Sequence, residues 1–290
     1  MELIFENANG EKLDLLRNRK KFCLIAAEGL HGVDVDFSET DVAYTDGTTI
    51  DSARALPRGI ALKFQFVGDV AAGLDFFHHF VKSKQVGKLI KTEGEKETKI
   101  KGRVTIPPYS RVSSAVTVEL QLYCSQPYWE DVAELVGTIP EIIDLLYFPV
   151  IGRGFPVEGV PFGAYNLEKT QTLVNDGDTS VGLTIIILAR GTVVNPRISC
   201  STGTQNGWYM TLNTTLESGD EVVISTHKRN KFITINGSEY KDGAPILSTL
   251  EYVGEDWLQL ETGSNTFNIT SDTEFAQVTF YLYYSRRWER

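Results

Sequence analysis

The chain has 290 residues, 42% of them hydrophobic, and a formal net charge of −10 at pH 7. This length suits about two domains of roughly 100–200 residues each, and the hydrophobic fraction excludes wholesale disorder. The negative charge opposes general affinity for nucleic acid. The sequence has no run of about 18 apolar residues, so we expect no membrane insertion.

The first residues and the cysteines indicate the compartment. The start of the chain lacks the basic and apolar regions of a signal peptide. Cys23, Cys124 and Cys200 are far apart and form no CxxC spacing, which argues against a disulfide framework and against a zinc site. We therefore expect a protein that is made and kept in a reducing cytosol.

Residues 1 to about 127 predict a β-rich domain that carries one helix. Strands at 3–5 and 13–16 flank an Asn9-Gly10 turn, which is typical of a hairpin. Between residues 69 and 81 the apolar spacing becomes helical, and Asp69 is placed to cap the start. Alternating or apolar runs predict further strands at 22–26, 33–37, 62–66, 87–91, 98–105 and 116–122.

Basic residues are concentrated in one part of this domain. From Lys82 to Arg103 there are eight basic residues and three acidic ones, a local excess of +5 against −15 for the rest of the chain. The excess fits the solvated face of a hairpin, and it also fits a surface that binds an acidic partner.

Residues 131–168 differ in composition from what precedes and follows them. The segments 131–136 and 140–146 are predicted as short helices, the second with the spacing of a capping box and a proline in its first turn. The segment 147–165 is rich in glycine and proline but also apolar, whereas an ordinary linker is polar. We predict a connector that packs against its own domain or against a neighbouring subunit.

From residue 173 to the end, the pattern is typical of an all-β sandwich. Runs at 222–226 and 232–235 flank a polar tip and predict a hairpin, in which Val222 and Ile224 share one face because side chains alternate along a strand. Ile233 and Ile235 share a face in the same way. Further strands are predicted at 184–188, 197–201, 208–212, 257–260, 267–270 and 277–284.

Catalytic signatures are absent from the sequence. It has no GxSxG, HExxH, GxxxxGK(S/T) or GxGxxG pattern, each of which would place a nucleophile, metal or phosphate site. We therefore predict that the protein is not an enzyme and that it has no catalytic, cofactor-binding or metal-binding residues.

Three acidic or histidine-containing groups have a weak likeness to metal sites. His78 and His79 with Asp75 would need a further ligand on the same helix face, and a solvated helix surface explains them as well. Strand alternation explains Asp34 and Asp36 as outward positions. A plain turn explains Asp176 and Asp178 as readily as a calcium loop.

Aromatic residues in the predicted sandwich allow two interpretations. Trp208, Tyr209 and Trp257 could form a platform on which a sugar ring stacks. Buried core positions are the commoner role of such side chains.

Several positions together resemble the siphophage distal tail proteins, the Dit-like family, which includes hubs of phage-tail-like particles. In the N-terminal part these are the Asn9-Gly10 hairpin, the 69–81 interruption, the basic hairpin and Tyr128-Trp129. In the C-terminal part they are short runs at 175–178, 195–198, 216–226, 235–237 and 260–265, and their order over nearly the whole chain carries the resemblance.

The resemblance implies a mainly β fold in three parts. It implies an N-terminal β-barrel-like domain with one inserted helix at residues 1–130, a connector with short helices at 131–168, and a C-terminal galectin-like β-sandwich at 169–290.

The same resemblance implies a structural protein of the virion tail, assembled in the host cytoplasm. Six copies would form a ring that joins the tail tube protein to the tail tip or baseplate proteins and to a receptor-binding protein. DNA would pass through the channel without specific binding, and no cofactor is implied. The alternative is a carbohydrate-binding sandwich that recognises cell-wall glycans.

Overall fold

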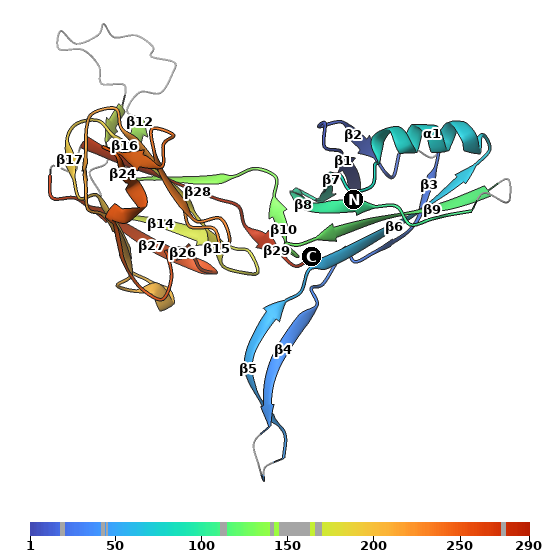
Figure 1. Cartoon of the computed structure of the whole chain (residues 1–290), viewed down its shortest axis with the longest axis horizontal. Helices are drawn as coiled ribbons and strands as arrows, with labels where there is room; N and C mark the ends of the chain where they lie inside the picture. Colours follow the sequence, from blue (N-terminus) through green and yellow to red (C-terminus); the bar gives the residue numbers. More distant parts are fainter. Residues whose placement is uncertain are drawn as a thin grey trace, which may run out of the picture. The chain divides into compact units, whose positions relative to one another are not determined.

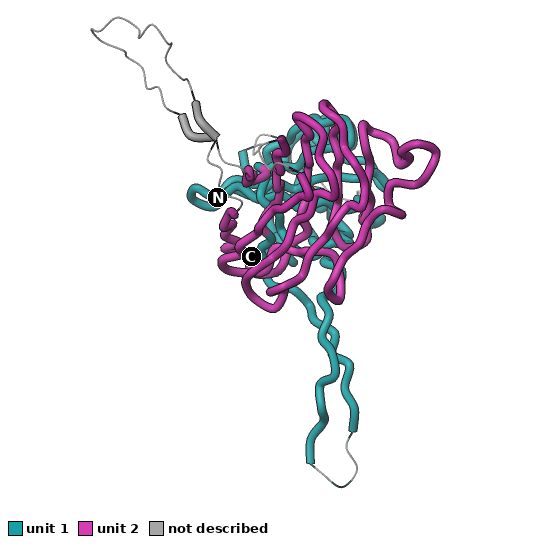
Figure 2. Tube along the Cα trace, turned by 90° about the vertical axis from the view of Figure 1, so that its left-hand side faces the viewer, with its two compact units in different colours: residues 1–133, 287–290 teal, residues 134–286 magenta. Residues whose placement is uncertain are grey.

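The computed structural model describes residues 1–17, 21–41, 44, 46–110, 115–139, 142–144, 163–165, 170–273 and 277–290. These residues form many β-strands and one α-helix, so the predicted mainly β fold is confirmed. They divide into two compact units, residues 1–133 with 287–290 (unit 1) and residues 134–286 (unit 2), which Figure 2 colours separately.

Unit 1 is built on an antiparallel sheet with the strand order β2-β1-β7-β8-β9-β6-β3. The order begins and ends with strands that have no further partner among the described residues, so the sheet is open rather than a closed barrel (Figure 1). Long apolar-polar alternation explains the central strands, whose inward side chains are fully buried. The bounds are β1 Glu2–Glu6, β2 Lys12–Asp14, β3 Cys23–Glu28, β6 Arg58–Val67, β7 Val86–Glu93, β8 Lys96–Thr105 and β9 Ala115–Cys124.

The helix α1, Val70–Phe80, covers part of this sheet's core as the sequence predicts. Its cap is Asp69, whose carboxylate accepts a 3.1 Å hydrogen bond from the Ala72 amide, satisfying a backbone donor that the first turn leaves free. Phe77 on the inner face is fully buried. Its ring lies 5.2–6.0 Å, between centroids, from the rings of Phe22, Phe64 and Phe66, a range that favours edge-to-face aromatic packing.

Strands β4, Val35–Asp41, and β5, Thr48–Ala55, pair only with each other and form a two-stranded ribbon (Figure 1). Alternation from Val33 to Phe37 is typical of a strand with one buried face. The strand forms, but the described residues leave its apolar side chains about half exposed to solvent: Val35 is 45% exposed and Phe37 is 51% exposed. Burial in this segment therefore needs atoms from outside the described residues.

The predicted helices of the connector are wrong where the structure describes them. Residues 131–136 contribute to β10, Trp129–Asp131, and β11, Leu135–Ile139. In the segment 140–146, Ile142–Asp144 is the strand β12, which pairs with β13, Gly163–Tyr165. Residues 147–162, the greater part of the predicted apolar connector, lie outside the described residues.

The strands β10 and β11 are each stabilised by a partner that is distant along the chain. β10 pairs with β29, Arg287–Trp288, and β11 pairs along its whole length with β28, Val278–Tyr284. The β-branched residues of β11 favour an extended backbone, and tertiary pairing outweighs the local capping signal. The compact units therefore differ in bounds from the predicted domains: β11 falls in unit 2, and the last four residues fall in unit 1.

Unit 2 contains two five-stranded antiparallel sheets, with the orders β11-β28-β16-β21-β22 and β14-β27-β18-β19-β25. Buried side chains of both sheets form one hydrophobic cluster, so the two sheets make a sandwich. The remaining bounds of these sheets are β14 Thr170–Asn175, β16 Thr184–Ala189, β18 Arg197–Cys200, β19 Tyr209–Leu212, β21 Glu221–Ser225, β22 Phe232–Ile235, β25 Leu250–Val253 and β27 Gly263–Thr270.

Short elements complete unit 2. Their bounds are β15 Val181–Gly182, β17 Val193–Val194, β20 Thr215–Leu216, β23 Tyr240–Lys241, β24 Ala244–Pro245 and β26 Gln259–Leu260, with 3-10 helices at Gly203–Gln205 and Ile246–Thr249. The β21–β22 hairpin forms as predicted, and in it Val222 lies opposite Ile235 and Ile224 lies opposite Ile233. All four side chains are buried in the sandwich core, so this hairpin prediction is confirmed.

Candidate functional site

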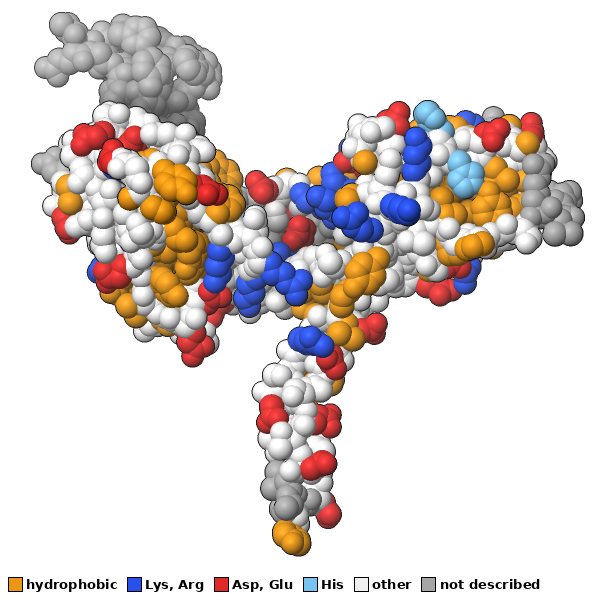
Figure 3. Space-filling model, in the orientation of Figure 1, with side chains coloured by type: hydrophobic (Ala, Val, Ile, Leu, Met, Phe, Trp, Pro, Cys, Tyr) orange, Lys and Arg blue, Asp and Glu red, His pale blue; other side chains and the backbone are white. Residues whose placement is uncertain are grey.

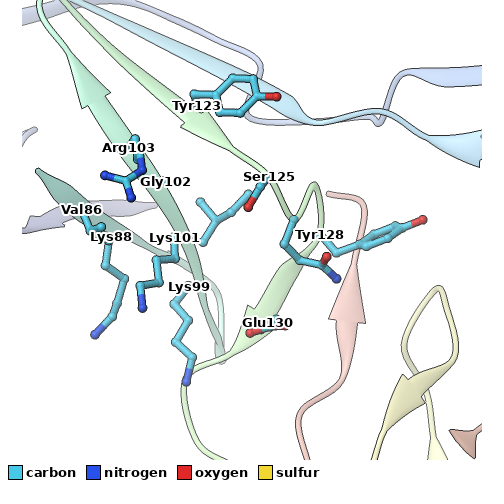
Figure 4. A pocket seen from close by; sticks show the side chains of 12 residues that line it. Val86, Lys88, Lys99, Lys101, Gly102, Arg103, Tyr123, Ser125, Tyr128 and Glu130 are labelled. Atoms are coloured by element: carbon cyan, nitrogen blue, oxygen red, sulfur yellow. The ribbon is translucent and has the colours of Figure 1, made fainter. Parts of the chain in front are cut away.

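Unit 1 carries a cleft of about 640 Å³ where β8, β9 and β10 meet (Figure 4). β8 pairs with β9 at residues 103–105 and with β10 at Thr98 and Lys99. Residues 100–102 lie between these two pairings and have no partner on that side. The cleft is therefore a gap in the sheet, opened where the chain leaves β9 and returns as β10.

Gly102 sets the edge of this gap. A Cβ atom built at Gly102 would lie 2.8 Å from the Cys124 sulfur and 3.0 Å from the Tyr123 carbonyl oxygen. Real Cβ atoms essentially never show the first distance and rarely show the second, so a side chain at this position would force β8 and β9 apart.

Four basic side chains line the cleft. Lys99, Lys101 and Arg103 alternate along β8, so they share one face of the sheet. Lys88 on β7 is directly opposite Lys101. Like charges directly opposite each other destabilise a sheet, so this arrangement costs stability unless an anion lies against it. Figure 3 shows the basic side chains gathered over β7 and β8.

The contacts within unit 1 neutralise these charges only in part. Lys88 forms a 2.5 Å ion pair with Glu6. Lys99 donates a 3.0 Å hydrogen bond to the neutral Val132 carbonyl, and Lys101 has no hydrogen bond or ion pair with a described residue. The single carboxylate of the lining, Glu130, pairs with Arg287 at 3.1 Å. The cleft therefore suits a partner that brings carboxylates.

A second feature of unit 1 is the fixed root of the β4–β5 ribbon. The buried Arg58 guanidinium donates hydrogen bonds to the carbonyls of Leu30 and Gly32, at 3.0 and 2.6 Å. The Trp129 indole also donates to Leu30, at 3.0 Å. These carbonyls belong to the segment that leads from β3 into β4. The ribbon is thus uncovered along its strands but held firmly where it leaves the sheet.

Arg58 also binds the end of the chain. It donates a 2.7 Å hydrogen bond to the Glu289 carbonyl, next to β29. Burial lowers the pKa of the Arg58 side chain from its ordinary value, and the three carbonyls supply acceptors for the charge. Sequence reasoning missed this residue, because its partners lie far from it along the chain.

Lys91 is a further charge in an unusual setting. Its side chain is only 2% exposed, and its amino group has no hydrogen-bond partner in the described residues. The group lies 3.6 Å from the Glu93 carboxylate and 4.8 Å from the centroid of the Trp129 ring. Burial lowers the pKa of Lys91 from its ordinary value of 10.5.

The metal-like groups of the sequence have other partners. His78 lies 2.7 Å from the Tyr109 hydroxyl, Asp36 accepts two hydrogen bonds from Arg54, and Asp176 forms an ion pair with Arg286 at 3.5 Å. No group of three or more His, Cys, Asp or Glu side chains within the described ranges is arranged to hold a metal ion.

The three aromatic residues of the sandwich do not share one exposed platform. Trp257 is 7% exposed and belongs to the core, and Trp208 packs against the same core. The Tyr209 ring is covered by the Arg197 guanidinium, 4.0 Å from the ring centroid. The burial of Trp257 and the packing of Trp208 agree with the interpretation as structural aromatics.

Among the described residues, no helix is both long enough and apolar enough to cross a membrane.

Comparisons with known proteins find one matching family and several solved structures of similar fold. Residues 176–288 match the family described as siphovirus-type tail component, C-terminal domain. The crystal structure of the Dit protein of phage SPP1, described as a paradigm of hub adsorption apparatus in phages that infect Gram-positive bacteria, is similar in fold, with 12% identity, 98% of each chain covered and a TM-score of 0.65.

A second solved structure is similar over the same extent. A chain of the phage P2 baseplate, in its activated conformation with calcium, is 9% identical, covers 99% of this chain and 98% of its own length, and has a TM-score of 0.51. At these identities the likeness concerns the fold. No curated protein sequence matches the chain.

Proposed function

We propose that this chain is a distal tail hub of the Dit-like phage tail proteins, on the strength of the family match at residues 176–288 and the fold shared over the whole chain. In this proposal six copies form a ring. The ring joins the tail tube to the tail tip or baseplate and to the receptor-binding proteins, and the protein acts by assembly rather than by catalysis.

The observation that carries the proposal is the match to tail components, together with a fold shared from end to end with a hub protein. The surfaces of unit 1 support it. The sheet is open at β2 and β3, the ribbon is uncovered, and the cleft holds unneutralised cations. Exposed edges and unmatched charges of this kind are surfaces with which a neighbouring subunit can pair.

The net charge supports a passive role toward DNA. A subunit with a formal charge of −10 repels phosphate on average, so a ring of such subunits would let duplex DNA pass without adhering to it. We therefore propose a channel with no specific DNA contacts, in a particle located at the virion tail and assembled in the host cytoplasm.

Light scattering after gel filtration tests the ring over a concentration series. The proposal expects a species of six chains that persists on dilution to low micromolar concentration. A strict monomer at every concentration would contradict it. A glycan array provides the comparison with the carbohydrate-binding alternative, and specific binding of a cell-wall glycan by the monomer would favour that alternative.

A further inference from the structure

We propose that the acidic β4–β5 ribbon of one copy docks into the basic cleft beside β8 of a second copy. The proposal rests on the proposed function, because it names the contact that would hold neighbouring subunits of the ring together.

The ribbon needs a partner surface. An isolated two-stranded ribbon is marginally stable in water, and every described residue of β4 is exposed. The described residues leave its apolar side chains about half open to water: Phe37 is 51% exposed and Ile50 is 58% exposed. A surface that covers the ribbon would stabilise the two strands and would shield their apolar side chains from water.

The ribbon and the cleft are opposite in charge. Between residues 34 and 55 there are six carboxylates and one basic residue, Arg54. Arg54 is already paired with Asp36 at 2.8 Å, so it neutralises one carboxylate only. The cleft presents four cations, of which Lys88 is paired with Glu6, and one carboxylate, Glu130, which is paired with Arg287. Each surface thus supplies the charges that the other lacks.

The cleft also offers apolar contact. Tyr123 and Tyr128 line it beside the basic residues (Figure 4), and Tyr123 is 58% exposed. The ribbon presents Val35 opposite Ala55 and Phe37 opposite Ala53 on one of its faces. Aromatic side chains that pack on a small apolar strip, with charges around them, are typical of a specific interface.

The anchoring of the ribbon favours docking over free movement. The hydrogen bonds from Arg58 and Trp129 to Leu30 fix the point at which the ribbon leaves the sheet. A fixed direction lowers the ordering entropy that binding must overcome. Because the ribbon and the cleft are different surfaces of one chain, copies that dock in this way make head-to-tail contacts, which form a ring when the rotation between neighbouring copies closes.

Charge reversal tests the contact. The cleft variant is Lys99→Glu with Lys101→Glu, and the ribbon variant is Glu39→Lys with Asp41→Lys. Like-charge contacts across an interface cost several kcal/mol, so we expect each variant to need at least about a hundredfold higher concentration for assembly. Matched controls carry the same charge changes elsewhere, Lys82→Glu with Lys228→Glu and Glu239→Lys with Glu255→Lys, and should assemble as the unaltered protein does.

Mixing the variants identifies the partner. In a one-to-one mixture, each ribbon meets a cleft of opposite charge on the other variant, so assembly should return. A chain that carries all four substitutions should also assemble alone. Rescue in the four-substitution chain without rescue in the mixture would mean that the ribbon docks on its own chain, and this result overturns the proposal.

A photo-cross-linking amino acid in place of Phe37 gives an independent readout. We expect a product with the mass of two chains, linked to the β8–β10 region. Products linked within one chain, or no product, contradict the proposal. Rings that form normally from both charge variants overturn the ribbon contact but leave the hub proposal intact. An unaltered protein that forms no ring overturns the hub proposal, and the cross-link then decides the contact by itself.

Discussion

Replacing Ile224 by aspartate should unfold unit 2. Ile224 is 1% exposed and lies between Ile185 and Ile233 in the central part of its sheet. Loss of the buried side chain costs about 2–5 kcal/mol. The unpaired carboxylate adds a cost of several kcal/mol more, because the cluster that surrounds Ile224 is hydrophobic. The sum is comparable with the whole stability of a domain, about 5–15 kcal/mol.

Unit 1 has its own core and should keep most of its structure. Its last strand is the exception, because unfolding of residues 134–286 leaves β29 at the end of a flexible loop of about 150 residues. Closing such a loop costs about 4 kcal/mol. β29 is held by the buried Trp288, worth roughly 3 kcal/mol, and by a few hydrogen bonds of about 1 kcal/mol each. The two totals are similar, so β29 should become marginal while the rest of unit 1 stays folded.

Hydrogen exchange followed by mass spectrometry resolves these parts. In Ile224→Asp we expect loss of protection throughout unit 2, partial loss at β10 and β29, and unchanged protection in β6 and β9. Asn230→Asp, which adds the same charge at an exposed turn of the same hairpin, is the control and should leave all protection unchanged. Loss of protection in β6 and β9 together with unit 2 would refute the reasoning, because the two units would then unfold as one.

Three further predictions concern unit 1. Lys91→Met should raise the stability of unit 1 by about 1–3 kcal/mol at neutral pH. Since the folded pKa of Lys91 lies below its ordinary 10.5, the difference in stability between the variant and the unaltered protein should shrink as alkaline pH removes the proton. Urea titrations across pH test this. Burial raises the pKa of Cys124 to about 11. A thiol reagent at mildly alkaline pH should therefore label the exposed Cys23 and reach Cys124 only after unfolding. Equal labelling rates for the two cysteines would contradict the burial of Cys124. Asp69→Ala removes the cap that accepts from Ala72 and should cost about 1 kcal/mol by urea unfolding, whereas an unchanged midpoint would show that the cap contributes nothing.

Local patterns predicted local structure well. The β21–β22 hairpin follows from alternation at Val222 and Ile224 and from turns within a few residues of them, and the helix follows from the apolar spacing after Asp69. Each of these elements is specified by residues that are neighbours in sequence. The physical cause lies within the window that sequence analysis reads.

Non-local pairing could not be predicted in the same way. Trp129 lies opposite Trp288, and Ile139 lies opposite Phe280, so the strands around residues 129–139 depend on partners that are distant in the chain. A capping-box spacing near Thr138 was therefore misleading. The exposed β4 shows the reverse case, because alternation at Val35 and Phe37 predicts a strand but does not say what covers it.

The candidate site was predicted in part. The excess of basic residues before Arg103 is visible in the sequence, and alternation places Lys99 and Lys101 on one face of a strand. The cleft depends on the separation of β9 from β8 after Gly102, which is a property of the sheet as a whole. Whether the basic face meets solvent or a partner is not decided by spacing.

The most direct test of the central claim is an electron micrograph of the purified full chain. The hub proposal predicts class averages with six-fold symmetry and a central channel, formed without DNA or other tail proteins. Averages that show only single subunits, in preparations concentrated well above the micromolar range, would contradict it.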